Sequence, residues 1–175
     1  MRKESRVTLY NILLPIWILV FWPSWLWLIL IPANYLIDRI VLRWSLGDMP
    51  EKGGFCRRHT WKVCIAGFVA DGVGALLLFA VFMFSAVVEE TKVGEIFHDI
   101  AYGVGFNPFS DILAFLVVVA AVLVAMLLIY LLDRWILKRA GLDMEQVKKS
   151  AIRLAVITAP YLFFFPSAVL YSGGI

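Results

Sequence analysis

The sequence alternates long apolar stretches with short segments that carry most of its charge. The charge-poor stretches are residues 11–37, 63–88, 112–132 and 154–172. A helix needs about 20 predominantly apolar residues to cross a bilayer, and each of these stretches approaches or exceeds that length. The pattern therefore predicts an all-α, polytopic membrane protein with four transmembrane helices, arranged as two tandem helical hairpins.

The first stretch, residues 11–37, admits two interpretations. Pro23 interrupts the helical hydrogen-bond ladder and predicts a kink in a single span. In the alternative, the segment dips into the membrane, turns near residues 22–24 and returns, which leaves three full spans. Because irregular backbone at membrane depth needs cover from protein or water, we favour the spanning interpretation.

Composition supports a membrane location. Of the 175 residues, 62% are hydrophobic and 17% are charged, whereas soluble domains carry about 25% charged residues. Four spans consume most of the chain. We therefore expect one transmembrane domain over residues 1–175, with no soluble domain and no cleaved signal.

Basic residues cluster in two segments. Six of the 16 Lys and Arg residues lie in 38–62 and six in 133–153, while Lys92 is the only one in 89–111. Basic loops tend to stay in the cytoplasm, so the loops 38–62 and 133–153 are predicted to be cytoplasmic and both termini to face outward. Three basic residues among the first six oppose this topology, and the re-entrant alternative would accommodate them.

The basic segments belong to an internal repeat. Residues 35–49 align without a gap with 130–144, and seven of the fifteen positions are identical. After a four-residue insertion, residues 57–68 align with 148–159. Shared apolar composition explains part of this match, but not the repeated Asp-Arg and Asp-Met pairs.

Each unit predicts a span running inward, a basic turn and a span running outward. Repeat 1 covers about residues 11–88 and repeat 2 about residues 107–172. Gly47 and Gly141 are suitable helix stops at the two turns. Because the units have like orientation, their symmetry axis would lie along the membrane normal, which excludes an inverted-repeat transporter.

Both units carry an Asp-Arg pair at the cytoplasmic end of the first span. The pairs are Asp38–Arg39 and Asp133–Arg134. Each aspartate can form an ion pair with its neighbouring arginine or with a basic residue of the next span. We favour this structural role over a role in an ion pathway.

Asp71 is the only formal charge well inside a predicted span. An ionised carboxylate near the bilayer centre costs about 2.5–3.5 kcal/mol, and such residues often mark ion or proton pathways. In the structural alternative, the carboxylate hydrogen-bonds to a neighbouring span through Asn34, Thr158 or Tyr161. The repeat places Leu162 opposite Asp71, so this carboxylate acts once per chain.

Small residues recur at every fourth position in two of the predicted spans. The two stripes are Ala66, Ala70 and Gly74, and Ala151, Ala155 and Ala159. Such stripes drive helix association in lipid. They predict close packing, either within the chain or against another protein.

Sequence signatures of catalysis are not visible. Cys56, His59 and Cys64 match none of the familiar zinc spacings, and no nucleophile triad or phosphate-binding loop is present. The acidic and histidine positions in 95–99 are typical of a solvated helix face. We expect neither an enzyme nor a cofactor, metal ion or nucleic-acid partner.

In the segments LPIWILVFWPSWLWLILIPANYLIDRIVL and GFVADGVGALLLF, the sequence resembles small, uncharacterised multi-span membrane proteins of Gram-positive anaerobic bacteria. The resemblance covers about the first half of the chain. It implies a bacterial plasma-membrane location and carries over no site residue.

These observations lead to two functional hypotheses. The first is a homo-oligomeric channel or transporter for an ion or small solute, with Asp71 and Asn34 near the path. The second is a non-catalytic membrane subunit or regulator that docks a partner through its small-residue helix faces. In either case the partners include the lipid bilayer, and the basic loops would attract anionic lipid headgroups.

Overall fold

All regular elements of the described chain are helices, which confirms the predicted all-α class. The computed structural model describes residues 15, 17–18, 27–88, 92–167 and 169. Within these residues the elements are α1 (Trp27–Ser45), α2 (Lys52–Val87), α3 (Lys92–Phe106), η2 (Pro108–Ser110), α4 (Ile112–Arg139), α5 (Met144–Ile157) and η3 (Tyr161–Phe164).

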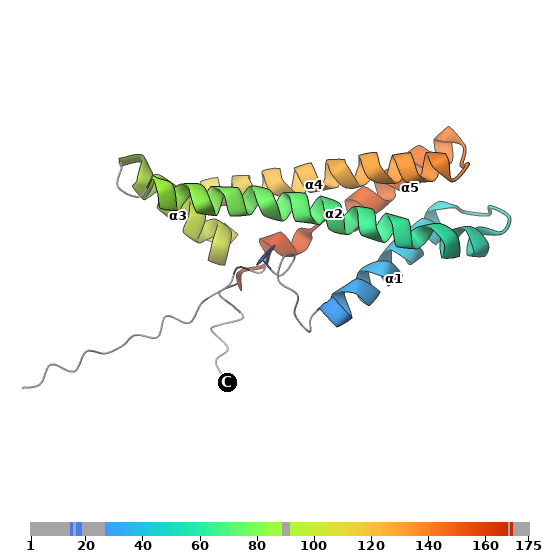
Figure 1. Cartoon of the computed structure of the whole chain (residues 1–175), viewed down its shortest axis with the longest axis horizontal. Coiled ribbons are helices and arrows are strands. Elements are labelled where there is room, and N and C mark those ends of the chain that lie inside the picture. Colours follow the sequence, from blue (N-terminus) through green and yellow to red (C-terminus); the bar gives the residue numbers. More distant parts are fainter. Residues whose placement is uncertain (1–14, 16, 19–26, 89–91, 168, 170–175) are drawn as a thin grey trace, which may run out of the picture.

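Helices α2 and α4 form the long axis of the molecule. They lie side by side and run in opposite directions (Figure 1). Their lengths are 36 and 28 residues, and within the described chain they are the two helices long and apolar enough to cross a membrane. They correspond to the predicted spans 63–88 and 112–132.

The other two predicted spans are not continuous helices of that length in the described residues. In the stretch 154–172, α5 ends at Ile157 and the short 3-10 helix η3 follows at Tyr161–Phe164. Most of the stretch 11–37 before α1 lies outside the described residues, and with it the choice between a spanning and a re-entrant segment. The predicted count of four transmembrane helices therefore remains a prediction.

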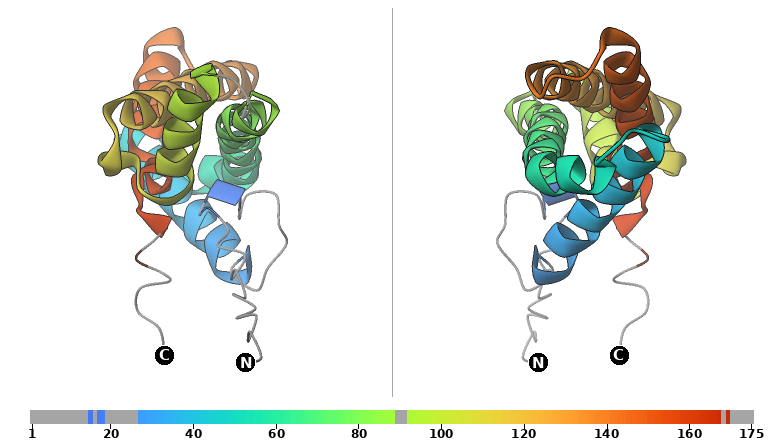
Figure 2. Two further views of the ribbon diagram at one scale, coloured as in Figure 1. Left: turned by 90° about the vertical axis from the view of Figure 1, so that its left-hand side faces the viewer. Right: turned by 90° about the vertical axis from the view of Figure 1, so that its right-hand side faces the viewer.

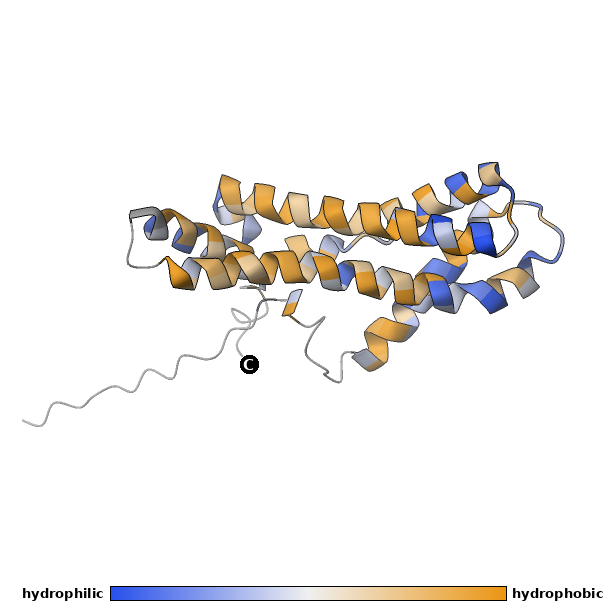
Figure 3. Cartoon of the chain, turned by 45° about the horizontal axis from the view of Figure 1, so that its top comes forward, coloured by the Kyte–Doolittle hydropathy of each residue, from blue (hydrophilic) through white to orange (hydrophobic). Residues whose placement is uncertain are grey.

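Both interhelical turns of the two hairpins lie at the same end of the molecule. The α1–α2 and α4–α5 turns are together at the right of Figure 1, and hydrophilic residues gather at this end in Figure 3. Gly47 and Gly141 follow the ends of α1 and α4 with φ of 55° and 88°. Only glycine adopts this left-handed conformation freely, so these residues stop the helices as predicted.

At the opposite end, α3 folds back against α2 and α4 (Figure 1). Its fit against α4 is tight, because a Cβ atom on Gly103 would lie 2.5 Å from the Cβ of Ala114. The Trp17 indole is buried and donates a hydrogen bond of 3.0 Å to the Val104 carbonyl. The segment 89–111, predicted as an outer loop, is thus largely a packed helix.

The small-residue stripe of α2 packs inside the molecule. The Cα of Gly74 approaches α4 so closely that a Cβ there would lie 3.3 Å from both the Ala121 carbonyl and the Ala125 methyl. Ala70 is buried together with Ile129 and with Ala155 of the second stripe. Both stripes therefore serve packing within the chain.

The short helices α1 and α5 complete the bundle. α1 packs against α2, α5 packs against α4, and α1 and α5 also contact each other. The end views in Figure 2 show α1 and η3 on the same side of the α2–α4 pair. This arrangement brings the chain beyond α5 opposite α1 and the middle of α2.

Candidate functional site

The candidate site begins with a break in the second hairpin after α5. The backbone N–H of Thr158 still bonds to the Leu154 carbonyl at 2.8 Å. Pro160 has no N–H to continue the ladder, and its ring would clash with the Val156 carbonyl in a helix. That carbonyl instead accepts a hydrogen bond from the hydroxyl of Tyr161. Pro160 thus explains locally why the helix does not continue.

The break leaves a cavity between α1, α2 and the chain from Ile157 to Pro166. Its volume is about 800 Å³. Most of its wall is apolar or aromatic, and the polar side chains are few. The lining residues on α1 and α2 are Trp27, Leu30, Asn34, Ile37, Asp38, Cys64, Gly67, Phe68 and Asp71.

The cavity brings together both intramembrane residues proposed from the sequence. Asp71 and Asn34 line it from α2 and α1. Asp38 lines the same cavity, although the sequence favoured a role in an ion pair at the membrane surface over a role in an ion pathway. Asp38 is 5% exposed, and Cys64 lines the same cavity.

Asp71 is not tied to the neighbours that the structural alternative assigned to it. Its Oδ1 atom is buried and has no hydrogen-bond partner among the described residues. The Thr158 hydroxyl donates to the Leu154 carbonyl instead, and the Tyr161 hydroxyl donates to its own segment. Neither hydroxyl therefore satisfies the carboxyl of Asp71, a residue that lines the cavity.

A third carboxyl, that of Asp133 on α4, lies in the core behind the cavity. Its side chain is 0% exposed, and neither oxygen has a hydrogen-bond partner within the described chain. Asp38 interacts electrostatically with both Asp133 and Asp71. The three aspartates thus form one acidic group, which we call the carboxyl cluster: Asp38, Asp71 and Asp133.

The ion pairs predicted for Asp38 and Asp133 are not formed. Neither Arg39 nor Arg134 lies within 4 Å of a carboxylate, because the only ion pair at that distance among the described residues joins His98 to Asp99 at 3.9 Å. Buried positions on the inner faces of α1 and α4 direct the aspartates away from the arginines that follow them.

Two arginines near the turns stack on tryptophans. The Arg153 guanidinium lies 4.0 Å from the ring centre of Trp44, and Arg139 lies 4.1 Å from that of Trp135. Both contacts are cation–π interactions. They occupy the outer surface of the bundle, and no basic side chain of the described residues forms an ion pair with the carboxyl cluster.

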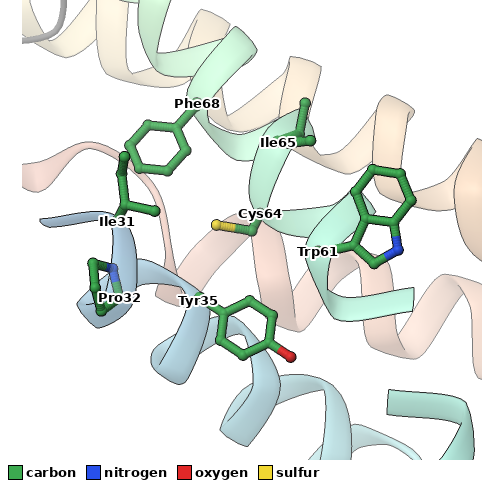
Figure 4. A pocket seen from close by; sticks show the side chains of 7 residues that line it. All are labelled: Ile31, Pro32, Tyr35, Trp61, Cys64, Ile65 and Phe68. Atoms are coloured by element: carbon green, nitrogen blue, oxygen red, sulfur yellow. The ribbon is translucent and has the colours of Figure 1, made fainter. Parts of the chain in front are cut away.

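A second, smaller hollow of about 370 Å³ lies between α1 and α2 (Figure 4). All seven of its lining side chains come from these two helices, and most are apolar. Cys64 and Phe68 line both this hollow and the cavity. These two side chains therefore lie between the cavity and this hollow.

The chemistry available in the cavity is recognition of positive charge. Asp38 and Asp133 are buried and Asp71 is partly buried. Carboxyls in a low-dielectric interior need protons or a bound cation to neutralise them. No group of three or more His, Cys, Asp or Glu side chains in the described chain has the arrangement of a metal site. Sequence reasoning missed the cluster, although the repeated aspartates and Pro160 were the signals for it.

Comparison with known proteins adds no relative from which a function could be transferred. No family model matches the chain, and no match is found among curated proteins or solved structures.

Proposed function

We propose that this protein is an integral membrane protein that binds a small cationic solute in the cavity and conducts it across the membrane. The observation that carries the proposal is a carboxyl cluster without a basic partner among the described residues, next to a cavity at a helix break. Such a cluster costs free energy unless a cation or protons neutralise it, and a transported cation would do so.

The broken second hairpin supports conduction. Discontinuous helices often form the solute site of membrane transporters, since non-helical backbone in a bilayer is tolerated only where protein covers it or it lines a cavity. The chain from Thr158 to Phe165 meets this condition, because it lines the cavity. Residues of α1 and α2 form the facing wall.

Helices α2 and α4 provide the membrane anchor in this proposal. Both turns with many basic residues lie at one end of the bundle, as a cytoplasmic position of loops 38–62 and 133–153 requires (Figure 3). The carboxyl cluster then lies within the membrane, nearer to the cytoplasmic side. The protein is placed in a bacterial plasma membrane and acts as a homo-oligomer.

The alternative of a regulatory subunit loses its sequence basis. It required the small-residue stripes to dock a partner, but Ala66, Ala70, Ala151, Ala155 and Ala159 are all less than 9% exposed within the chain. Docking would need a different surface, and the described residues favour none. The conduit is therefore the function that we put to the test.

The first experiment measures cation flux into liposomes that contain the purified full chain. We expect flux above that of empty liposomes, and we expect Asp71→Asn to lower it at least about 10-fold, or about 1.4 kcal/mol in the barrier. The matched control is Asp99→Asn, which removes an exposed carboxylate of α3 remote from the cavity. Equal flux for wild type and Asp71→Asn would remove the carboxyl from the mechanism.

Oligomeric state is tested separately in lipid nanodiscs by mass measurement of single particles. The proposal expects more than one chain per particle at low protein density. A strictly monomeric protein that still conducts would place the path within one chain.

A further inference from the structure

We infer that the cavity takes an organic amine, a small ammonium ion with an apolar or aromatic body, in preference to an inorganic cation. This inference names the solute class of the proposed conduit and so rests on the proposed function. It follows from the size of the cavity, from the residues of its walls and from the distribution of its few polar groups.

The size of the cavity matches an organic molecule. Its volume of about 800 Å³ lies within the range of about 300–1,000 Å³ that is typical of small-molecule sites. A bare metal ion would fill a small part of this space and would leave the apolar walls without a contact. An amine with a ring or a short hydrocarbon body would bind the carboxyls through its ammonium group and contact the apolar walls through its body.

The walls provide two kinds of contact on opposite parts of the ligand. Asp71 and Asp38 line the cavity, and a carboxyl is the group to which an ammonium ion donates its strongest hydrogen bonds. Trp27 and Phe68 line the same space, with ring centres 6.3 Å apart and ring planes inclined by 13°. Aromatic faces attract cations and pack against apolar bodies, so these rings complement the remainder of an organic ammonium ion.

Aromatic residues of the broken segment close the opposite side. Phe163, Phe164 and Phe165 follow the break and line the cavity. Phe163 is buried, and Phe164 is partly buried against the same core cluster. The cavity therefore combines aspartates of α1 and α2 with aromatic side chains from both of its sides, which suits an amphipathic cation.

The same walls are unsuited to a hard inorganic cation. Ca²⁺ takes six to eight oxygen ligands and Mg²⁺ needs an octahedral set, so both depend on several converging oxygens. Within the described residues no three acidic, histidine or cysteine side chains converge in that way. Desolvation of an inorganic ion in this cavity would be poorly offset, whereas an organic cation is less strongly hydrated.

The hollow in Figure 4 provides a route by which such a solute can approach the cavity from the lipid. The walls of this hollow are mostly apolar, and of its lining residues only Cys64 and Phe68 also line the cavity. Cys64 and Phe68 therefore lie where the two spaces adjoin. An amine with an apolar body partitions into the bilayer and can use this approach, whereas a hydrated inorganic ion cannot.

The test uses radiolabelled phenethylamine as the probe and the purified full chain in detergent, with binding read by scintillation proximity. We expect saturable binding that excess unlabelled phenethylamine displaces. NaCl or KCl at a 100-fold molar excess over the probe, at constant ionic strength, should not displace it. Asp71→Asn should weaken binding at least 10-fold, and Asp99→Asn should leave it unchanged. Phe68→Leu should weaken binding several-fold, with Phe79→Leu on the exposed face of α2 as its matched control.

The outcomes separate this inference from the proposed function. Displacement of the probe by Na⁺ or K⁺, or lack of probe binding by a protein that still conducts inorganic cations in an Asp71-dependent manner, would overturn the amine and leave the conduit. Amine binding that depends on Asp71 and Phe68 without any flux would support the site and overturn the conduit. If Asp71→Asn fails to fold, the Phe68→Leu pair and the salt competition on wild type decide the inference.

Discussion

The two hairpins of this chain, α1–α2 and α4–α5, are alike near their turns and different farther away. At positions that align in sequence, the same side of the helix is buried in both. The buried pairs are Asp38 and Asp133, Val41 and Ile136, Leu42 and Leu137, Val63 and Leu154, and Cys64 and Ala155.

The outward faces of the two hairpins correspond as well. Trp61 is 51% exposed and the aligned Ile152 is 52% exposed, while Ile40 and Trp135 are 58% and 55% exposed. Equal exposure at aligned positions means that each hairpin presents the same faces to the core and to its surroundings. This half of the molecule acts as a common scaffold.

Beyond the scaffold the hairpins differ in which helix is long. In the first hairpin α2 continues to Val87, whereas in the second α5 ends at Ile157 and the chain turns irregular. The alignment pairs Asp71 on the continuous helix with Leu162 in the irregular segment. The cavity lies at this point of divergence, so a feature that one hairpin has and the other lacks creates the site.

The largest expected effect on stability comes from the contact of α2 with α4 and η3. A Cβ on Gly74 would lie 3.0 Å from Phe163 and 3.3 Å from the Ala121 carbonyl. We expect Gly74→Leu to lower the free energy of unfolding in detergent by about 1–3 kcal/mol, as overpacking does. Gly72→Leu, where a Cβ meets open space, is the control and should change stability far less; equal losses would show that this close approach is unimportant.

Pro160 tests whether the break after α5 makes the cavity. Pro160→Ala restores a backbone N–H and removes the clash with the Val156 carbonyl, so α5 can extend toward the space of the cavity. We expect phenethylamine binding to weaken about five-fold, or about 1 kcal/mol, with no loss of thermal stability. Unchanged binding would mean that other contacts hold the segment open.

The two turns should respond alike to substitution. Gly47 and Gly141 have positive φ and open space around the Cα, so an alanine at either position is strained only by its backbone. We expect Gly47→Ala and Gly141→Ala each to destabilise by about 1 kcal/mol. Gly72→Ala in the middle of α2 should stabilise instead, by about 0.5–1 kcal/mol. A large difference between the two turns would break the likeness of the hairpins.

The smallest effect is expected at a pair of aligned positions that differ by one hydroxyl and one methyl group. Thr60 is fully buried and its hydroxyl donates to the Cys56 carbonyl at 2.7 Å, whereas the aligned residue of α5 is Ala151. Because the hydroxyl bonds back to its own helix, Thr60→Ala should change the free energy of unfolding by about 1 kcal/mol or less. Chemical denaturation in mixed micelles measures the difference, and a loss well above this value would indicate a further contact of the hydroxyl.

Several features of the fold could be predicted from the sequence because they depend on local properties. The lengths of the apolar stretches predicted α2 and α4. Gly47 and Gly141, which have positive φ, end α1 and α4 at the turns that the sequence predicted. The repeated pattern of residues 35–49 and 130–144 anticipated two hairpins with their basic turns at one end. Burial of the small-residue stripes followed from close helix packing, although the sequence left open whether the partner lay within the chain.

The sequence by itself determined which residues have to leave water and where the helices of the described chain turn, because apolar length and backbone conformation are properties of short segments. Only the tertiary structure decided that Asp38 and Asp133 face inward, away from Arg39 and Arg134, and that Asp71 joins Asp38 at one cavity. The rotation of each helix about its axis is set by packing against at least two others at once. A carboxyl cluster built from α1, α2 and α4 is therefore a property of the assembled bundle, which no single helix carries.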